Sequence, residues 1–597
     1  MAETETQSVE EATWDLEPLV DGRGAQGVDE LLDEAQSKAS TLAENKGHIA
    51  EFDGARLAAY MNDLAEVYDL VGRAGSYAGL AFSADMSDEK RGALMQKVQE
   101  RATEIETTLL FFHLEWAKLS DKQVDELLAS DGLERARHYL RSARRYRDYL
   151  LSEPEEKILS EKSVTGEAAW ERLFGELTSA LEIELDGEKV GIEQALSRLH
   201  NPDREVRKRA AGAITEGLAP GLRTRAFIFN TLLHEKAVND RLRGYKHWLQ
   251  SRNLANEASD ESVEALVSAV RSRYDIPQRW YSLKAKMMGL DRIADYDRMA
   301  SLARDDEKVE WPDAKRIVHE SYASFSGELA GIVQEFYDKR WIDAPASPGK
   351  RPGAFCSYTV PSRNPYVLLN YTARRRDVLT LAHELGHGVH SALARKQGIF
   401  HHSTPLTVAE TASVFGETVV FDRLLEMEED PAGRLALLAE NVEGGIATVF
   451  RQTAMNRFEH LVHTARREEG ELPVERINEA WTESQREMLG DSVELTDGYR
   501  TWWSYVPHFI STPGYVYAYS YGQLLALAVY KQYREQGDGF VPHYLEMLGA
   551  GGSMSPEELG KIVDCDLTDP EFWNGGLSIV ADQLESAEAA AKQAGRL

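Results

Sequence analysis

The stretch that decides the fold is His383-Glu384-Leu385-Gly386-His387, in which two histidines stand four residues apart and a glutamate follows the first. Positions i and i+4 of an α-helix project from one face, because each residue advances the helix by about 100°. Two imidazoles on that face can hold one zinc ion, and the glutamate between them can reach a zinc-bound water as general base. The competing interpretation is a helix with two surface histidines and no metal.

The residues around the motif predict a helix. Asp377 is a residue type favoured at a helix N-cap, and it precedes the motif at a suitable distance. The apolar residues that follow repeat at the spacing of one helical face: Val378, Leu381, Leu385, Val389 and Leu393. We therefore expect the two histidines to lie inside a helix that begins near Asp377.

A carboxylate from a second element is expected to complete the site, because a catalytic zinc takes three protein ligands and keeps one position open. Glu410 is well placed, and Glu417 shares its face two turns later in a segment of helical apolar spacing. One carboxylate could bind the metal while the other holds a ligand imidazole. Thr407-x-x-Glu410 also fits a capping box, which would occupy the same side chain, and Glu417 could be a solvated helix residue.

Two short strands are predicted before this helix, at 354–360 and 366–371. A strand beside a zinc helix can bind an extended peptide through main-chain hydrogen bonds, which reads length and direction but not sequence. Gly353, Ala354 and Phe355, at the start of the first strand, are the candidates for substrate contact. A simple buried hairpin is equally compatible with these residues.

A third cluster lies far downstream and consists of His508 and a row of tyrosines: Tyr515, Tyr517, Tyr519 and Tyr521. Peptide hydrolysis develops negative charge on a tetrahedral oxygen, and imidazole or phenol donors aimed at that oxygen lower the barrier. Packing is the more common role of any single buried tyrosine. The cluster alone therefore leaves a catalytic and a structural role open.

Together, these segments resemble the thimet-oligopeptidase and oligoendopeptidase F family of zinc metallopeptidases, and the oligoendopeptidase F branch most closely. The resemblance covers most of the chain. Its motifs are Gly353 to Cys356, Pro365 to Tyr371, Leu381 to His387, Ala409 to Glu417, and Pro507 to Phe509 with the tyrosines that follow.

The resemblance implies the roles of the metal-site residues. His383, His387 and Glu410 match the ligands of one zinc ion per chain, and Glu384 matches the general base. Glu417 is expected to support a ligand imidazole from behind.

The resemblance also implies that His508 and a tyrosine, Tyr519 first, stabilise the tetrahedral intermediate. Residues 511–514 change the spacing after His508. Tyr515 and Tyr517 therefore remain candidates for the tyrosine that stabilises the intermediate, and otherwise for substrate contact.

Length, charge and cysteine content favour a soluble cytoplasmic enzyme. The chain has 597 residues, enough for a large core, and no apolar run approaches the roughly 18 residues that span a bilayer. A net charge of −31 argues against nucleic acid or an anionic membrane as the main partner. Two cysteines make no disulfide scaffold, and the acidic start is unlike a secretory signal.

We expect a mainly α fold with a small β-sheet beside the zinc helix. Asp186-Gly187 predicts a hairpin turn. By resemblance, a helical N-terminal lid closes over a deep channel. The expected layout is a flexible acidic N-terminus 1–13, a helical lid domain 14–200 with a small hairpin at 180–192, a catalytic domain 201–585, and a frayed C-terminal tail 586–597.

The sequence thus predicts a zinc-dependent endopeptidase that hydrolyses short oligopeptides. One alternative is a zinc carboxypeptidase or dipeptidase of related architecture, which would need a group that binds a terminal charge. Another is a helical protein that binds peptides or structural zinc without hydrolysis. Glu384 argues against the last, since a structural site needs no base. The sequence leaves cleavage preference, oligomeric state and the metal used in the cell open.

Overall fold

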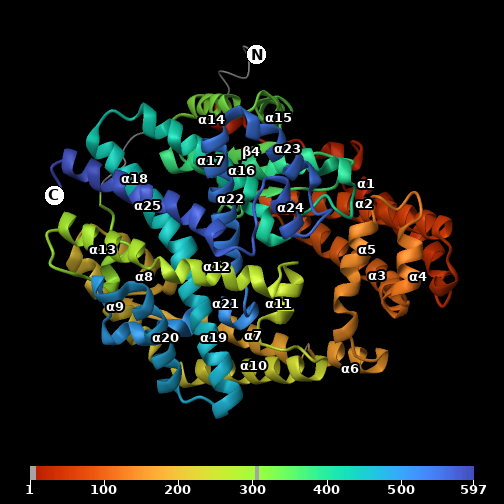
Figure 1. Ribbon diagram of the computed structural model, residues 1–597, viewed down its shortest axis with the longest axis horizontal. Coiled ribbons are helices and arrows are strands. Elements are labelled where there is room, and N and C mark those ends of the chain that lie inside the picture. The colour runs from red at the N-terminus through yellow and green to blue at the C-terminus, as the bar shows by residue number, and fades with distance from the viewer. Residues whose placement is uncertain (1–7, 164, 303–307) are drawn as a thin grey trace. The chain divides into compact units, whose positions relative to one another are not determined.

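The structure, a computed structural model, describes residues 8–163, 165–302 and 308–597 (Figure 1). It groups into two compact units, each assembled from three segments of chain. Unit 1 comprises 1–147, 306–426 and 529–566, and unit 2 comprises 148–305, 427–528 and 567–597. Helices dominate both units, as the sequence predicts. The predicted domain boundary near residue 200 stays a prediction.

Unit 1 contains the motif helix and a three-stranded sheet. Its helices are α1 Gly24–Ala43, α2 Gly54–Ala84, α3 Glu89–Lys118, α4 Asp121–Leu128, α5 Arg137–Ala143, α14 Trp311–Phe325, α15 Gly327–Asp338, α16 Arg375–Ala394, α17 Leu406–Met427, α23 Val541–Ala550 and α24 Pro556–Ile562. Its strands are β4 Ile342–Pro345, β5 Phe355–Ser357 and β6 Tyr366–Tyr371.

The first three long helices pack against one another, as their amphipathic sequences predict (Figure 1). On α1, Val28, Leu31, Leu32 and Ala35 are buried at helical spacing. Helix α2 begins after Asp53, whose carboxylate accepts a hydrogen bond from the Arg56 N–H at 2.8 Å.

The sheet has the order β4-β6-β5, with β4 parallel and β5 antiparallel to the central strand. Phe355 pairs with Leu368 and Ser357 with Tyr366. Strand β6 is almost entirely buried, whereas β5, at the edge, is half-buried. The strand predicted at 366–371 is confirmed, whereas the strand predicted at 354–360 is shorter and covers only Phe355–Ser357. Gly353 and Ala354 lie just before this edge strand.

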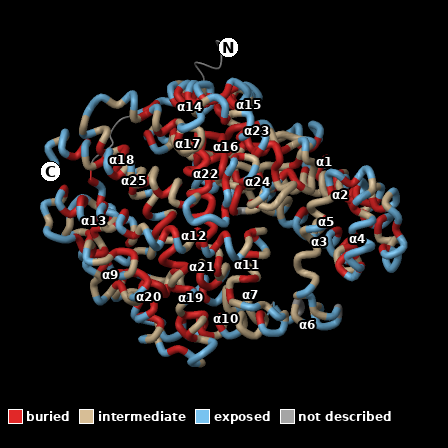
Figure 2. Tube along the Cα trace, in the orientation of Figure 1, coloured by how far each residue is buried: buried red, intermediate tan, exposed pale blue. Residues whose placement is uncertain are grey.

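Helix α16 packs on this sheet and on α14, α15 and α23. Much of it is buried (Figure 2), including Val378, Leu381, Leu385 and Val389 of the predicted apolar face. Asp377 is not the N-cap, because the helix begins at Arg375. Its carboxylate instead accepts hydrogen bonds from the Thr372 and Arg374 N–H groups at 2.7 and 3.1 Å, so it stabilises the first turn from inside the helix.

Two glycines let α16 and α17 approach closely. A Cβ atom on Gly386 would lie 2.4 Å from the Ala412 carbonyl oxygen and 2.5 Å from the Ser413 Cα. One on Gly416 would lie 3.3 Å from the Ala382 carbonyl oxygen. Any larger side chain at these positions would push the helices apart, so the glycine inside the motif sets the distance between its histidines and α17.

Unit 2 is built from helices around a large aromatic core and carries a small hairpin. Its helices are α6 Glu153–Ser163, α7 Glu167–Ser179, α8 Ile192–Ser197, α9 Arg204–Leu218, α10 Leu222–Arg243, α11 Gln250–Ala255, α12 Asp260–Ser272, α13 Asp275–Met287, α18 Pro431–Gly445, α19 Gln452–Glu469, α20 Val474–Leu489, α21 His508–Ser511, α22 Tyr517–Gln536 up to residue 528, and α25 Pro570–Gln593. Strands β3 Ile293–Ala294 and β7 Val493–Glu494 pair in parallel.

The predicted hairpin is confirmed. Strands β1 Glu182–Leu185 and β2 Glu188–Gly191 pair antiparallel, with Leu185 opposite Glu188. Asp186 and Gly187 have φ angles of 53° and 86°, as a two-residue turn of this hand requires.

The described parts of the two segments expected to be flexible make contacts with the rest of the protein. Helix α25 continues to Gln593, and Ala587, Ala590 and Ala591 are buried on it. These small residues recur at helical spacing and give the segment an apolar face that the prediction of a frayed tail overlooked. At the other end, residues 1–7 lie outside the described residues, but the Ala12 carbonyl accepts a hydrogen bond from the Ala344 N–H at 2.8 Å.

Candidate functional site

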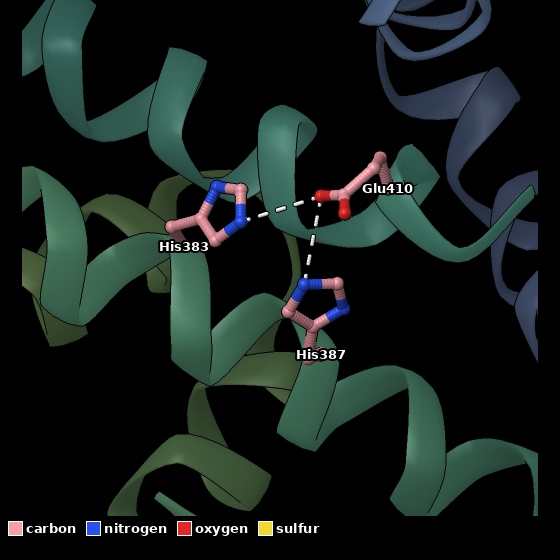
Figure 3. Close-up of side chains that lie close together, drawn as sticks. All are labelled: His383, His387 and Glu410. Atoms are coloured by element: carbon pink, nitrogen blue, oxygen red, sulfur yellow. Dashed lines mark ion pairs between the residues drawn. The ribbon is translucent and has the colours of Figure 1, made fainter. Parts of the chain in front are cut away.

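The structure brings His383, His387 and Glu410 together, as the sequence predicts (Figure 3). The Glu410 Oε2 atom lies 3.3 Å from His383 Nε2 and 3.5 Å from His387 Nε2. One donor atom from each of the three residues falls within 4.8 Å of the others. The two imidazoles come from one face of α16, and the carboxylate comes from the first turns of α17.

The capping-box alternative for Glu410 is wrong. Helix α17 begins at Leu406, so Thr407 lies inside the helix and is not its N-cap. The Glu410 carboxylate lies beside the imidazoles and accepts a hydrogen bond from the Ser413 hydroxyl at 2.7 Å.

The three side chains hold different charges. Burial lowers the pKa of His383, but hydrogen bonds to Glu410 and Glu417 outweigh it and raise that pKa well above 6.5. Burial lowers the pKa of His387 to about 4. Burial opposes ionisation of Glu410, yet its hydrogen bond to His383 brings its pKa down to about 2. Without a metal, a protonated His383 therefore neutralises the Glu410 carboxylate.

The Glu384 side chain lies beside strand β5 and not among the three donor residues. Its side chain is buried, and burial raises its pKa to about 7, while the positive charge of His383 and the Cys356 N–H act in the opposite direction. The Cys356 main chain belongs to edge strand β5. The carboxylate thus lies beside the sheet edge, and its raised pKa in the metal-free protein makes it a stronger base than an exposed glutamate, which suits a general base.

Further side chains support the donors from behind. His383 Nδ1 donates to Glu417 Oε2 at 3.0 Å, which leaves Nε2 toward Glu410. The Tyr358 hydroxyl lies 3.4 Å from His387 Nδ1. The prediction for Glu417 matches this geometry, whereas Tyr358 and Ser413 were missed. Ser413 stands one helical turn after Glu410, so its spacing was a usable signal; Tyr358 offered none.

The three substrate-contact candidates lie at the start of the edge strand. Gly353 is exposed and has φ of 83°, and its carbonyl accepts a hydrogen bond from Asn370 Nδ2 at 2.8 Å. Ala354 is half-buried, and the Phe355 ring carries the Arg351 guanidinium 5.1 Å from its centroid.

His508 and two of the tyrosines form a second cluster, which belongs to unit 2. His508 Nε2 lies 3.3 Å from the Tyr519 hydroxyl, and the Tyr515 ring stacks near-parallel on His508 at 6.1 Å. Burial lowers the pKa of His508, so the imidazole is neutral at physiological pH and one ring nitrogen can donate a hydrogen bond.

Tyr517 does not join this cluster, which corrects its candidacy for substrate contact. Its side chain is fully buried, and its hydroxyl accepts a hydrogen bond from Asn256 Nδ2 at 2.9 Å. Tyr515 lies just before α22, and Tyr517 and Tyr519 lie in its first turn, so the segment is not a strand. The Tyr515 and Tyr519 rings lie 5.1 Å apart, whereas Tyr517 is buried in the core.

Two further properties bear on the classes of protein considered. Across the described residues, every helix is too short or too polar to cross a membrane. Both cysteines, Cys356 and Cys565, are free thiols.

Comparison with known proteins identifies the family. The Peptidase family M3 profile matches residues 197–579, and an Oligopeptidase F profile matches 115–182. The oligopeptidase PepF of Bacillus subtilis (strain 168) is 28% identical over 97% of this chain and 87% of its own. An oligoendopeptidase F homolog of Lactococcus lactis subsp. lactis is 24% identical over 98% of both chains.

Solved structures agree on the fold. The crystal structure of oligoendopeptidase-F from Enterococcus faecium superposes with a TM-score of 0.71, at 22% identity, over 95% of this chain and 99% of its own. Since the M3 profile spans more than half of the residues, the chain belongs to peptidase family M3, a class of metallopeptidases, and is a peptidase.

Proposed function

We propose that this peptidase is a zinc-dependent endopeptidase in which His383, His387 and Glu410 hold one zinc ion. The observation that carries the proposal is the three-donor cluster with Glu384 beside it. Tetrahedral zinc with bonds of about 2.0–2.1 Å places neighbouring ligand atoms roughly 3.3–3.4 Å apart. The 3.3 and 3.5 Å separations from Glu410 Oε2 to the two Nε2 atoms fit that requirement.

The donor set also fits a catalytic zinc better than a structural one. Among the described residues the group has three members, two imidazoles and one carboxylate, whereas a structural site is closed by four protein ligands. Glu417 and Tyr358 hold the outer nitrogens of the two imidazoles, an arrangement that fixes tautomers and raises the basicity of ligands.

When bound, zinc would polarise the attacking water and the scissile carbonyl. Glu384 accepts the proton of that water and passes it to the leaving amine. Burial raises the pKa of this carboxyl group above its ordinary value, to about 7 in the metal-free protein, so it is a stronger base than an exposed glutamate. His508 and Tyr519 donate hydrogen bonds to the oxygen that becomes negative as the carbonyl is attacked. Their mutual contact and the neutral imidazole support this pairing.

The substrate we propose is a short, extended peptide. Because the Cys356 N–H points to Glu384, the Cys356 carbonyl points the same way, outward from the sheet edge. An extended peptide paired with this edge would lie beside the catalytic base. Gly353, Ala354 and Phe355 are the proposed contact residues. The relatives named oligopeptidase and oligoendopeptidase support an internal cut in an oligopeptide.

A cytoplasmic location is part of the proposal. Its support is the pair of free thiols and the strongly acidic composition.

Product analysis tests the proposed activity. A peptide acetylated at its N-terminus and amidated at its C-terminus is incubated with zinc-loaded protein, beside the same peptide with free ends. An endopeptidase cuts both at the same internal bonds. Cleavage of only the free peptide, one or two residues from an end, would identify an exopeptidase. An intact peptide with both substrates would favour a peptide-binding protein.

A further inference from the structure

A buried carboxyl group anchors the segment between His508 and the tyrosines. Glu459 lies on α19 with 1% of its surface exposed, and its Oε1 atom accepts a hydrogen bond from the Gly514 N–H at 2.7 Å. Its second oxygen, Oε2, is buried and has no hydrogen-bond partner among the described residues. Burying a carboxyl group that makes only one hydrogen bond is costly, so the contact with the Gly514 N–H is the feature to explain.

The segment that Glu459 holds is the short turn 511–514. Gly514 has φ of +76°, and a Cβ atom there would lie 2.6 Å from Leu249 Cδ1 and 3.4 Å from the Trp248 ring. Trp248 is itself fixed by His463, which stacks on it at 4.5 Å, one turn after Glu459 on the same helix. The turn thus packs against Leu249 and Trp248, and one hydrogen bond joins it to α19.

The turn connects α21, which begins with the proposed donor His508, to the start of α22, which carries the proposed donor Tyr519. At its start, the Thr512 N–H donates to the His508 carbonyl at 3.1 Å. At its end, the Tyr515 N–H donates to the Thr512 carbonyl at 3.1 Å, and Tyr515 stacks on His508. A shift of Gly514 would therefore change the distance between His508 and Tyr519.

We propose that Glu459 is a positioning residue for the His508–Tyr519 pair, acting through its hydrogen bond to the Gly514 N–H. The inference rests on the proposed role of His508 and Tyr519 in stabilising the oxyanion. Glu459 touches neither substrate nor reacting atoms; it sets the turn that spaces the two donors.

The chemistry of the contact dictates the matched variants. Burial raises the pKa of Glu459 to about 8, so the neutral carboxylic acid predominates near neutral pH and an amide mimics it. Glu459→Gln keeps an acceptor oxygen for the Gly514 N–H. Glu459→Met has a similar volume and no acceptor, and Glu459→Asp keeps the acid but is one methylene too short.

The experiment measures kcat and KM on a blocked peptide with the full-length, zinc-loaded protein. Since a displacement of about 1 Å can cost up to about a hundredfold in rate, we expect Glu459→Met to lower kcat by about ten- to a hundredfold. KM and zinc content should stay near those of the wild type, and Glu459→Gln should restore most of the rate. If the Met variant does not fold, Glu459→Asp takes its place.

A double-mutant cycle separates this proposal from the one it rests on. In a His508→Ala background, Glu459→Met should cause little further loss, because the pair it positions is already broken. The same loss in both backgrounds, a Gln variant as slow as Met, or a Met variant as fast as wild type would overturn the proposal. If His508→Ala alone has wild-type rates, the proposed role of His508 is refuted, and with it the role of Glu459 in positioning His508.

Discussion

Replacing Glu384 with Gln isolates the proposed general base. The carboxyl group is buried, and its pKa is about 7 in the metal-free protein. The isosteric amide removes at most one negative charge and leaves the three donor residues untouched. We expect Glu384→Gln to bind zinc as the wild type does.

The expected loss of turnover follows from the proton transfer. General-base catalysis contributes about 10²- to 10⁴-fold, so kcat/KM should fall by at least about a hundredfold, or about 2.7 kcal/mol of transition-state stabilisation. The wild-type rate should fall as pH drops through the pKa of Glu384, since the base must be ionised. A zinc ion nearby lowers that pKa below the metal-free value of about 7. The residual rate of the variant should lack this acidic limb.

The assay is hydrolysis of a blocked fluorogenic peptide between about pH 5 and 9, a range that brackets the expected titration, with zinc measured on the same samples. Glu426→Gln is the matched control, because Glu426 is an exposed glutamate of the same unit whose carboxylate lies 3.6 Å from Arg423. A fully zinc-loaded Glu384→Gln protein that works within about tenfold of the wild type would refute the assignment of this base.

Zinc binding, protonation and substrate shape give three further predictions. Glu417→Gln should weaken zinc affinity by about 10- to 100-fold in a chelator competition, because Glu417 orients His383 through the 3.0 Å hydrogen bond; unchanged affinity would make it a solvated helix residue. Near pH 7, zinc uptake should release at least about one proton: His383 carries one in the metal-free protein, Glu384 with a pKa of about 7 carries a fraction of one that zinc displaces, and His387 and Glu410, with pKa values of about 4 and 2, have none to lose. The zinc affinity should therefore fall as the pH falls. Calorimetry in buffers of different ionisation enthalpy measures the protons released, and zinc binding without proton release would contradict this prediction. A scissile sequence should be cut far faster as a free peptide than in a loop of a stable folded protein, because edge pairing needs an extended chain; equal rates in a gel assay would contradict this.

Local sequence patterns predicted the parts of the site that depend on spacing along one element. The i, i+4 relation of His383 and His387 and the common face of Glu410 and Glu417 follow from helix geometry alone. The hairpin at Asp186-Gly187 follows from turn chemistry. In each case, the information lies within a few residues.

Apart from Ser413, the contacts of the site that were missed join segments far apart in the chain. The buried Tyr517 pairs with Asn256, which removes it from the substrate-contact candidates, and His387 gains Tyr358 from the residue just after strand β5. Neither partner can be recognised from spacing. The predicted N-cap role of Thr407 was wrong because α17 begins one residue earlier, at Leu406. Helix ends are the least certain part of a sequence-based prediction.

The most direct test of the central claim is an anomalous difference map of zinc-loaded crystals measured at the zinc absorption edge. The account predicts one strong peak per chain, about 2.0–2.2 Å from His383 Nε2, His387 Nε2 and a carboxylate oxygen of Glu410, with no fourth protein ligand. Zinc at any other set of residues, or a site closed by a fourth protein ligand, would contradict it.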